Sequence, residues 1–245
     1  MNYKRYFFSG KEWIRIIAEF LLIDIVVSYL FYDSHIAFLL GLTGFIPYIN
    51  YRKKRFLKKR IELLKDEFLE LIGTVSGKMR GGMSPENAFI DSYKDMENMY
   101  GLSAPICREL KQIIMRLNRQ EMLDVCLYDF GMRSGVEDIY DFAEVFAIVK
   151  SGSGRIRDVI EDTITMMREK NDTESEIAVL ISGKRLEQKI MCIIPLIIIG
   201  YLRLQTGEFI SVLYHNPLGI GIMSICLIIY AASFLLSERM ADIEV

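Results

Sequence analysis

The chain has 245 residues, of which 51% are hydrophobic and 25% charged, and its formal net charge is −2. Nucleic-acid binding relies on an excess of Lys and Arg, but residues 52–189 hold 24 Lys and Arg against 24 Asp and Glu. This balance argues against a nucleic-acid-binding protein. Apolar residues gather instead near both ends of the chain, which predicts membrane segments on either side of a charged domain.

Two apolar runs at the start of the chain predict a transmembrane helical hairpin, which we assign to a first region, residues 1–51. A helix needs about 20 mostly apolar residues to cross a hydrocarbon core about 30 Å thick. Residues 13–32 form the first predicted span and residues 36–51 the second, with a short polar turn between them. The second span is short for this purpose.

Three charged residues, Arg15, Glu19 and Asp24, lie within the first predicted span. An ionisable group in lipid is costly and usually faces another helix or an aqueous cavity. Arg15 and Glu19 are four residues apart, so they can pair on one helix face. Asp24 has no such partner. Two interpretations stay open for it: a contact with a neighbouring helix, or a local defect that water reaches.

A basic cluster follows the second predicted span. Its seven members are Arg52, Lys53, Lys54, Arg55, Lys58, Lys59 and Arg60. Segments rich in Lys and Arg stay in the cytoplasm, and basic residues directly below a bilayer also suit anionic lipid headgroups. We interpret the cluster as a topology signal, a lipid contact, or both. It predicts that the central block is cytoplasmic.

The central block, residues 52–189, is predicted to be a bundle of about six helices. From Leu57 the apolar residues recur at steps of three and four, as one helix face requires. This helix is expected to stop at Gly81 and Gly82. The next should begin with Ser84 as N-cap and Pro85 at the first helical position, where a missing N–H costs nothing.

Further helices are predicted at about 104–117, from about 121 to Gly131, and from just after Ser134 to Ser151. The sixth begins after a turn that contains Gly152 and Gly154. When the sequence is aligned with itself at an offset of 71 residues, residues 66–89 align with residues 137–160, and Gly81 aligns with Gly152. The identity is weak, but the pattern predicts two similar helix-turn-helix units. No stretch alternates like a strand.

A second pair of apolar runs, in residues 190–245, predicts two more spans at about 190–204 and 217–236. The first contains Pro195 and is short, and the second is uninterrupted by charge. Basic residues flank this pair on the side of the central block, so both chain ends and the block are expected in the cytoplasm. We thus expect an all-α polytopic membrane protein with about four spans. The rival interpretation is a soluble protein that buries these runs as core helices.

Catalytic signatures are missing from the sequence. The two histidines, His35 and His215, fall at the predicted outer ends of spans, and SGSGRIRDV has no Lys-Ser/Thr pair of a phosphate loop. Acidic pairs such as Glu67 with Glu70, or Asp138 with Asp141, are expected on solvated helix faces. We therefore predict neither an enzyme nor a metal or cofactor site.

Three segments in order resemble the type II secretion F family of platform proteins, in particular its tight adherence (Tad) pilus branch. They are KMRGGMSPENAFIDS, FAEVFAIVKSGSGRIRDVIEDTITMMREK and ISGKRLEQKIMCIIPLIIIGYL. The family generally carries two complete copies of the domain with three spans, whereas this chain has one domain between two pairs of apolar runs. That difference favours the Tad branch. The second turn reads Ser-Gly-Ser-Gly where the family often has adjacent glycines.

The resemblance implies a bacterial inner-membrane platform without enzymatic activity. Such a platform docks a cytoplasmic ATPase, holds pilin-like subunits, and couples the ATPase to their extraction and assembly. It would form homo- or hetero-oligomers with a related platform protein and contact membrane lipids. Two other functions stay open: a membrane-tethered scaffold or signalling protein, and a small transporter or channel that uses Asp24.

Overall fold

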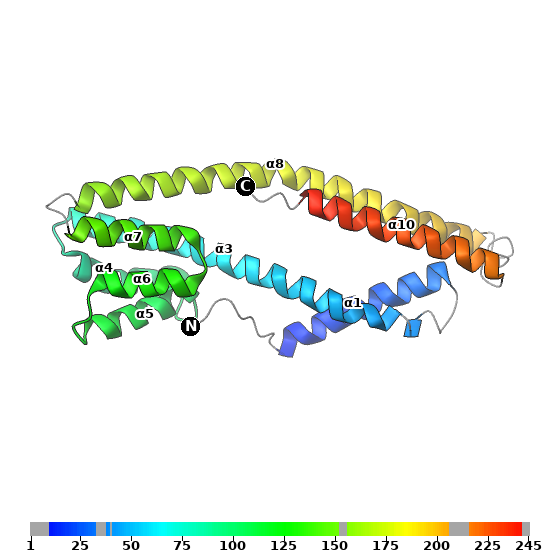
Figure 1. Cartoon of the computed structure of the whole chain (residues 1–245), viewed down its shortest axis with the longest axis horizontal. Helices are drawn as coiled ribbons and strands as arrows, with labels where there is room; N and C mark the ends of the chain where they lie inside the picture. Colours follow the sequence, from blue (N-terminus) through cyan, green and yellow to red (C-terminus); the bar gives the residue numbers. More distant parts are fainter. Residues whose placement is uncertain (1–9, 33–37, 40, 152–155, 206–215, 242–245) are drawn as a thin grey trace. The chain divides into compact units, whose positions relative to one another are not determined.

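The computed structural model describes residues 10–32, 38–39, 41–151, 156–205 and 216–241. These residues form helices and turns and contain no strand, so the all-α class is confirmed. The elements are α1 (Gly10–Phe31), a short 3-10 helix (Leu42–Gly44), α3 (Phe45–Arg80), α4 (Pro85–Tyr100), α5 (Pro105–Leu117), α6 (Leu123–Ser134), α7 (Glu137–Ser151), α8 (Ile156–Gln205) and α10 (Pro217–Ala241). The α-helices are labelled in Figure 1.

The chain divides into two compact units. The helical domain is Arg52–Asp172, and the apolar unit comprises Phe8–Tyr51 and Thr173–Val245. The first division coincides with the predicted start of the central block, whereas the second precedes its predicted end at residue 189. Helices α3 and α8 each contribute residues to both units.

Both of these helices are longer than the sequence pattern suggested. The end of the predicted second span, from Phe45, and the first domain helix form parts of one helix, α3, of 36 residues. The predicted sixth helix, the polar run after it and the third span likewise form one helix, α8, of 50 residues. The polar stretches between these parts, residues 52–56 and 168–176, are rich in Lys, Arg and Glu, which favour helix. The apolar pattern alone could not show that the helix continues.

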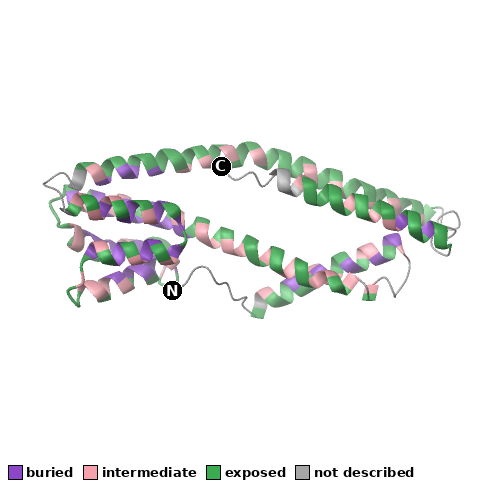
Figure 2. Ribbon diagram, viewed as in Figure 1, coloured by how far each residue is buried: buried purple, intermediate pink, exposed green. Residues whose placement is uncertain are grey.

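The helical domain has one hydrophobic core, to which all six of its helices contribute, and buried positions gather on their facing sides (Figure 2). At its centre, the ring of Phe68 from α3 meets Phe130 of α6 and Phe142 of α7 edge-on, with centroids 6.0 and 5.5 Å apart. The core members on α3 are Leu64, Phe68, Leu69, Leu71, Ile72, Val75 and Met79. Most of them lie on the face that the sequence periodicity predicts.

The turn between α3 and α4 has the predicted form. Gly82 adopts φ +96°, a left-handed conformation that suits glycine. Ser84 is the N-cap of α4 and its hydroxyl accepts a hydrogen bond from the Asn87 N–H at 3.4 Å, with Pro85 at the first helical position. The glycine pair therefore ends one helix while Ser84 starts the next.

The 71-residue offset pairs two glycine turns, of which the structure describes only the first. Helix α3 ends at Arg80 and α4 begins at Pro85, whereas α7 is described up to Ser151 and α8 from Ile156. The second glycine turn, with Gly152 and Gly154, lies outside the described residues. The relation between the two predicted helix-turn-helix units stays a prediction.

The predicted stop at Gly131 is wrong, because α6 continues to Ser134 and ends at Gly135 in the left-handed conformation, φ +73°. Gly131 is buried and lets the α7 backbone approach closely. A Cβ at Gly131 would lie 2.8 Å from the Tyr140 Cα atom. Because Gly131 has no side chain, it allows α6 and α7 to pack closely, and it does not end a helix.

We expect Gly131→Ala to destabilise the helical domain by about 1–3 kcal/mol, because its new methyl group meets backbone that cannot move aside. Gly77→Ala is the matched control, since a Cβ there meets nothing within 4 Å. It should stabilise the helix by about 0.5–1 kcal/mol. Denaturant unfolding of the full chain in detergent, followed by circular dichroism, measures both. Equal effects would contradict the packing role of Gly131.

In the apolar unit, one described helix is long and apolar enough to cross a membrane, over Pro217–Ser237 of α10. Only 11% of its most apolar 18-residue stretch is buried. The other three predicted spans are not confirmed. Helix α1 has the length but carries Arg15, Glu19 and Asp24. The predicted span at 36–51 lies partly outside the described residues.

Helix α1 packs against α10 through a small cluster of Leu30, Phe31 and Met223. The Tyr32 and Ser224 hydroxyls share a hydrogen bond of 2.9 Å. Arg203 of α8 donates a hydrogen bond to the Tyr29 carbonyl of α1. Polar contacts thus join three helices of an otherwise apolar unit.

Candidate functional site

The buried face of α1 contains the acid singled out from the sequence. Ile16, Phe20, Asp24 and Ser28 recur every four residues and are all buried. Among the described residues, none forms a hydrogen bond with Oδ2 of Asp24. The carboxyl group lies against Gly41, where an added Cβ would come within 1.8 Å of Oδ1. Asp24 therefore lies against the neighbouring segment at Gly41.

The other two charged residues of the first predicted span, Arg15 and Glu19, do not pair with each other. Arg15 is exposed, and no ion pair between Arg15 and Glu19 is present among the described contacts. Glu19 accepts a hydrogen bond from the Tyr48 hydroxyl at 3.4 Å. Phe20 adds ring contacts to Phe45 and Tyr48, with centroids 5.0 and 5.4 Å apart. This face of α1 thus packs on the first turns of α3.

Pro195 lies inside α8, where it has no N–H to donate to the carbonyl four residues earlier. Close to it, the Tyr230 hydroxyl of α10 donates a hydrogen bond to the Cys192 carbonyl at 2.7 Å. The two helices leave an open groove of about 590 Å³ that Pro195, Tyr230 and Phe234 help to line. Lys184 and Glu187 lie at one end of the lining, and the rest is mainly apolar.

The basic cluster lies on α3, at the start of its domain part. Lys53, Lys54, Arg55, Lys58 and Lys59 are exposed, whereas Arg52 and Arg60 are half-buried. The Arg52 guanidinium lies 5.6 Å from the centroid of the Phe56 ring, a cation–π distance. The five exposed side chains lie outside the domain core and are accessible to an anionic surface.

Glu67 was expected on a solvated face, but only 3% of it is exposed. Its Oε2 atom accepts a hydrogen bond from the Ile106 N–H at 2.9 Å. That N–H belongs to the first turn of α5, which has no side-chain cap of its own. Burial raises the pKa of Glu67, while the Ile106 hydrogen bond opposes this shift. Glu67 of α3 thus caps α5, whereas Glu70 is exposed as expected.

Asp138 is likewise buried, although Asp141 is exposed as expected. Its carboxylate binds Lys170 of α8 at 2.6 Å and Lys65 of α3 at 3.2 Å, so it joins three helices. Burial by itself would raise the pKa of Asp138, but the two ammonium groups outweigh it and lower the pKa below its ordinary 3.8.

We expect Asp138→Asn to lower the free energy of unfolding at pH 7 by about 1.5–3 kcal/mol, the usual value of charged hydrogen bonds. Because the folded-state pKa of Asp138 is depressed, its contribution is complete above about pH 3.8 and is lost as the pH falls further. Unfolding of the full chain in detergent between pH 2.5 and 7 measures this. Asp162→Asn, at an exposed acid, is the control, and a pH-independent difference would contradict the ion pair.

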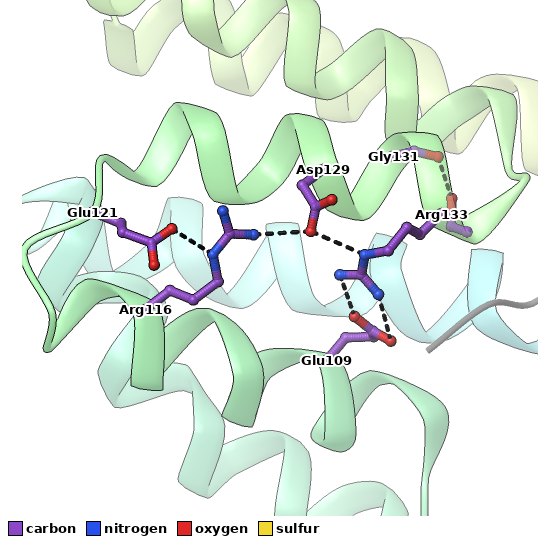
Figure 3. A network of polar contacts seen from close by, with 7 residues as sticks. Glu109, Arg116, Glu121, Asp129, Gly131 and Arg133 are labelled. Carbon is purple, nitrogen blue, oxygen red and sulfur yellow. Dashed lines mark hydrogen bonds and ion pairs between the residues drawn. The ribbon is translucent and has the colours of Figure 1, made fainter.

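A polar network that the sequence did not reveal joins α5 and α6 (Figure 3). Arg133 donates to both carboxylate oxygens of Glu109, at 3.4 and 3.0 Å, and to Asp129 at 2.9 Å. Arg116 donates to Asp129 at 2.8 Å and to Glu121 at 2.6 Å. The Glu109 side chain has no exposed surface.

One signal could have predicted the network. Glu109 follows Ile106 by three residues and so falls on the apolar face of α5, where an acid needs a buried cation. The buried carboxylates of the helical domain, Glu67, Glu109 and Asp138, are all held in structural contacts. No group of three or more His, Cys, Asp or Glu among the described residues could hold a metal ion. The arrangement stabilises a helical scaffold.

Comparison of the chain with protein-family models, with curated proteins and with solved structures gave no match.

Proposed function

We propose that this protein is the membrane platform of a Tad-like or related type II secretion F system, which couples a cytoplasmic ATPase to the assembly of pilin-like subunits. The observation that supports this most is the continuity of α3 and α8. Each is a single helix with residues in both the helical domain and the apolar unit. A movement of the helical domain would therefore be transmitted to the membrane segments by the continuous helices α3 and α8 and not by a flexible loop.

The apolar unit supports a membrane location. Helix α10 leaves most of its apolar surface exposed, which a water-soluble protein would bury in its core. Four spans with a cytoplasmic helical domain remain our proposal. The exposed lysines of the basic cluster would then lie at the cytoplasmic membrane surface, next to lipid headgroups.

The groove between α8 and α10 is our candidate for holding the transmembrane helix of a pilin-like subunit. Its lining is mainly apolar, with Ser233 and Ser237 on α10 as small polar residues. Helices pack closely in lipid where small residues line the interface. The platform itself would take its energy from the ATPase.

Copurification tests this proposal. The tagged full chain, extracted from native membranes with mild detergent, should bring down a secretion ATPase and a pilin-like subunit. An unrelated multi-pass protein from the same membranes is the control. Recovery of neither partner would favour a membrane-tethered scaffold or signalling protein.

A second candidate function rests on Asp24. Its buried carboxyl, in contact with Gly41, resembles the intramembrane acids that line ion or proton paths. Ion or proton flux in vesicles that contain the purified protein alone would favour a transporter or channel. Loss of that flux in Asp24→Asn would assign it to this residue.

A further inference from the structure

A small pocket in the helical domain lies between α3 and the domain part of α8. Its volume is about 180 Å³. Its polar lining comes from both helices and consists of Ser76, Arg80, Glu161, Thr165 and Arg168, with Gly73 beside them. The proposed platform role uses none of these residues.

The pocket has an excess of positive charge and an uncommitted donor. Arg80 forms an ion pair with Glu161 at 3.0 Å. Among the described residues, no carboxylate forms an ion pair with the exposed Arg168, and none forms a hydrogen bond with the Ser76 hydroxyl. The Thr165 hydroxyl donates to the Glu161 carbonyl at 2.9 Å. A guanidinium and a hydroxyl therefore face the pocket with their donors unused.

Gly73 accommodates the Arg168 side chain. An added Cβ at Gly73 would lie 2.6 Å from Nη2 of Arg168. Glycine in the middle of a helix destabilises the helix relative to alanine. Here that cost allows the guanidinium to lie close against α3, at the edge of the pocket.

We propose that this pocket binds an oxyanion group, a carboxylate or a phosphate. The planar guanidinium of Arg168 matches two oxygens of such a group, and Ser76 adds a third donor. The Arg80 guanidinium supplies further positive charge. Pockets for drug-sized ligands occupy about 300–1,000 Å³, so this one fits a single anionic group and not a nucleotide.

The same chemistry has two sources, a free phosphate ion and an acidic side chain of a partner protein. Inorganic phosphate and N-acetylglutamate are the probes for the two. Each is titrated into the full chain in detergent by calorimetry, at constant ionic strength in chloride buffer. Saturable binding of either probe supports the site, and the tighter probe identifies the source.

Arg168→Gln should weaken binding of the tighter probe at least 10-fold. Gly73→Ala leaves every charge in place but displaces the guanidinium, so it should weaken binding several-fold. Arg108→Gln is the matched control, since it removes an exposed arginine of α5 outside the pocket. Circular dichroism confirms that each variant remains folded.

Three results would overturn the proposal. One is the lack of saturable binding of either probe above the chloride background. Another is an equal effect of Arg168→Gln and Arg108→Gln, which would reduce the binding to general charge attraction. The third is wild-type affinity in Gly73→Ala, because the guanidinium could not then be the ligand in its present position.

Discussion

Replacing Arg133 with methionine is expected to lower the free energy of unfolding by about 3–5 kcal/mol, the usual cost of leaving one partner of a buried ion pair alone. Glu109 has no exposed surface, and Arg133 approaches both of its carboxylate oxygens (Figure 3). Without the guanidinium, the buried carboxylate would lose both hydrogen bonds from Arg133 or take up a proton. Denaturant unfolding of the full chain in detergent measures the loss.

Two further variants separate the pair from general effects of the substitution. Arg108→Met removes an exposed arginine of the same domain and should change the stability by less than about 0.5 kcal/mol. The double variant Glu109→Met with Arg133→Met removes both charges and should recover most of the loss. If Arg133→Met were no worse than Arg108→Met, the network would not stabilise the domain.

A helix break in α8 is expected to abolish pilus assembly. Leu180 lies within α8 and is 76% exposed, so its side chain adds little to packing. Proline at this position removes a backbone hydrogen bond and clashes with the preceding turn, at a local cost of about 3 kcal/mol. The core of the helical domain ends before this point in the sequence, at Met167, and should remain intact.

Leu180→Ala is the matched control, because it shortens the side chain and keeps the helix. Both variants are compared for abundance in the membrane and for the amount of assembled pilus. We expect equal abundance, normal assembly with alanine and no assembly with proline. Normal assembly with Leu180→Pro would show that the coupling does not need an unbroken α8.

Periodicity predicted the helices of the domain well, because each one must turn a single apolar face toward a shared core. The spacing of Leu64, Phe68, Leu71 and Val75 follows from that requirement alone, and all four are buried. Turn chemistry was equally local. Ser84 caps α4 as its position before Pro85 predicts.

The errors arose where a residue serves a neighbouring helix. Glu67 and Asp138 look like surface acids within their own helices, yet one caps α5 and the other binds lysines of α3 and α8. Gly131 resembles a helix stop but allows the close approach of α7. The apolar pattern within one helix contains no information on contacts with neighbouring helices.

The charged residues of the first apolar run likewise make contacts that the pattern of their own helix could not predict. The spacing of Arg15 and Glu19 permits an ion pair, but Glu19 accepts from Tyr48 instead. Asp24 could be recognised from the sequence as an acid without a partner on its own helix. Its contact with Gly41 depends on how two segments meet, which the sequence alone did not specify. The four-span topology and the platform role stay predictions.

Deletion of the gene in a strain that retains the secretion ATPase and the pilin-like subunits tests the platform role most directly. Assembled pilus or pseudopilus is measured on the cell surface, with the intact gene supplied in trans as the control. We expect assembly to stop while both partners remain at normal levels, and to return with the intact gene. Normal assembly in the deletion strain would contradict the platform role.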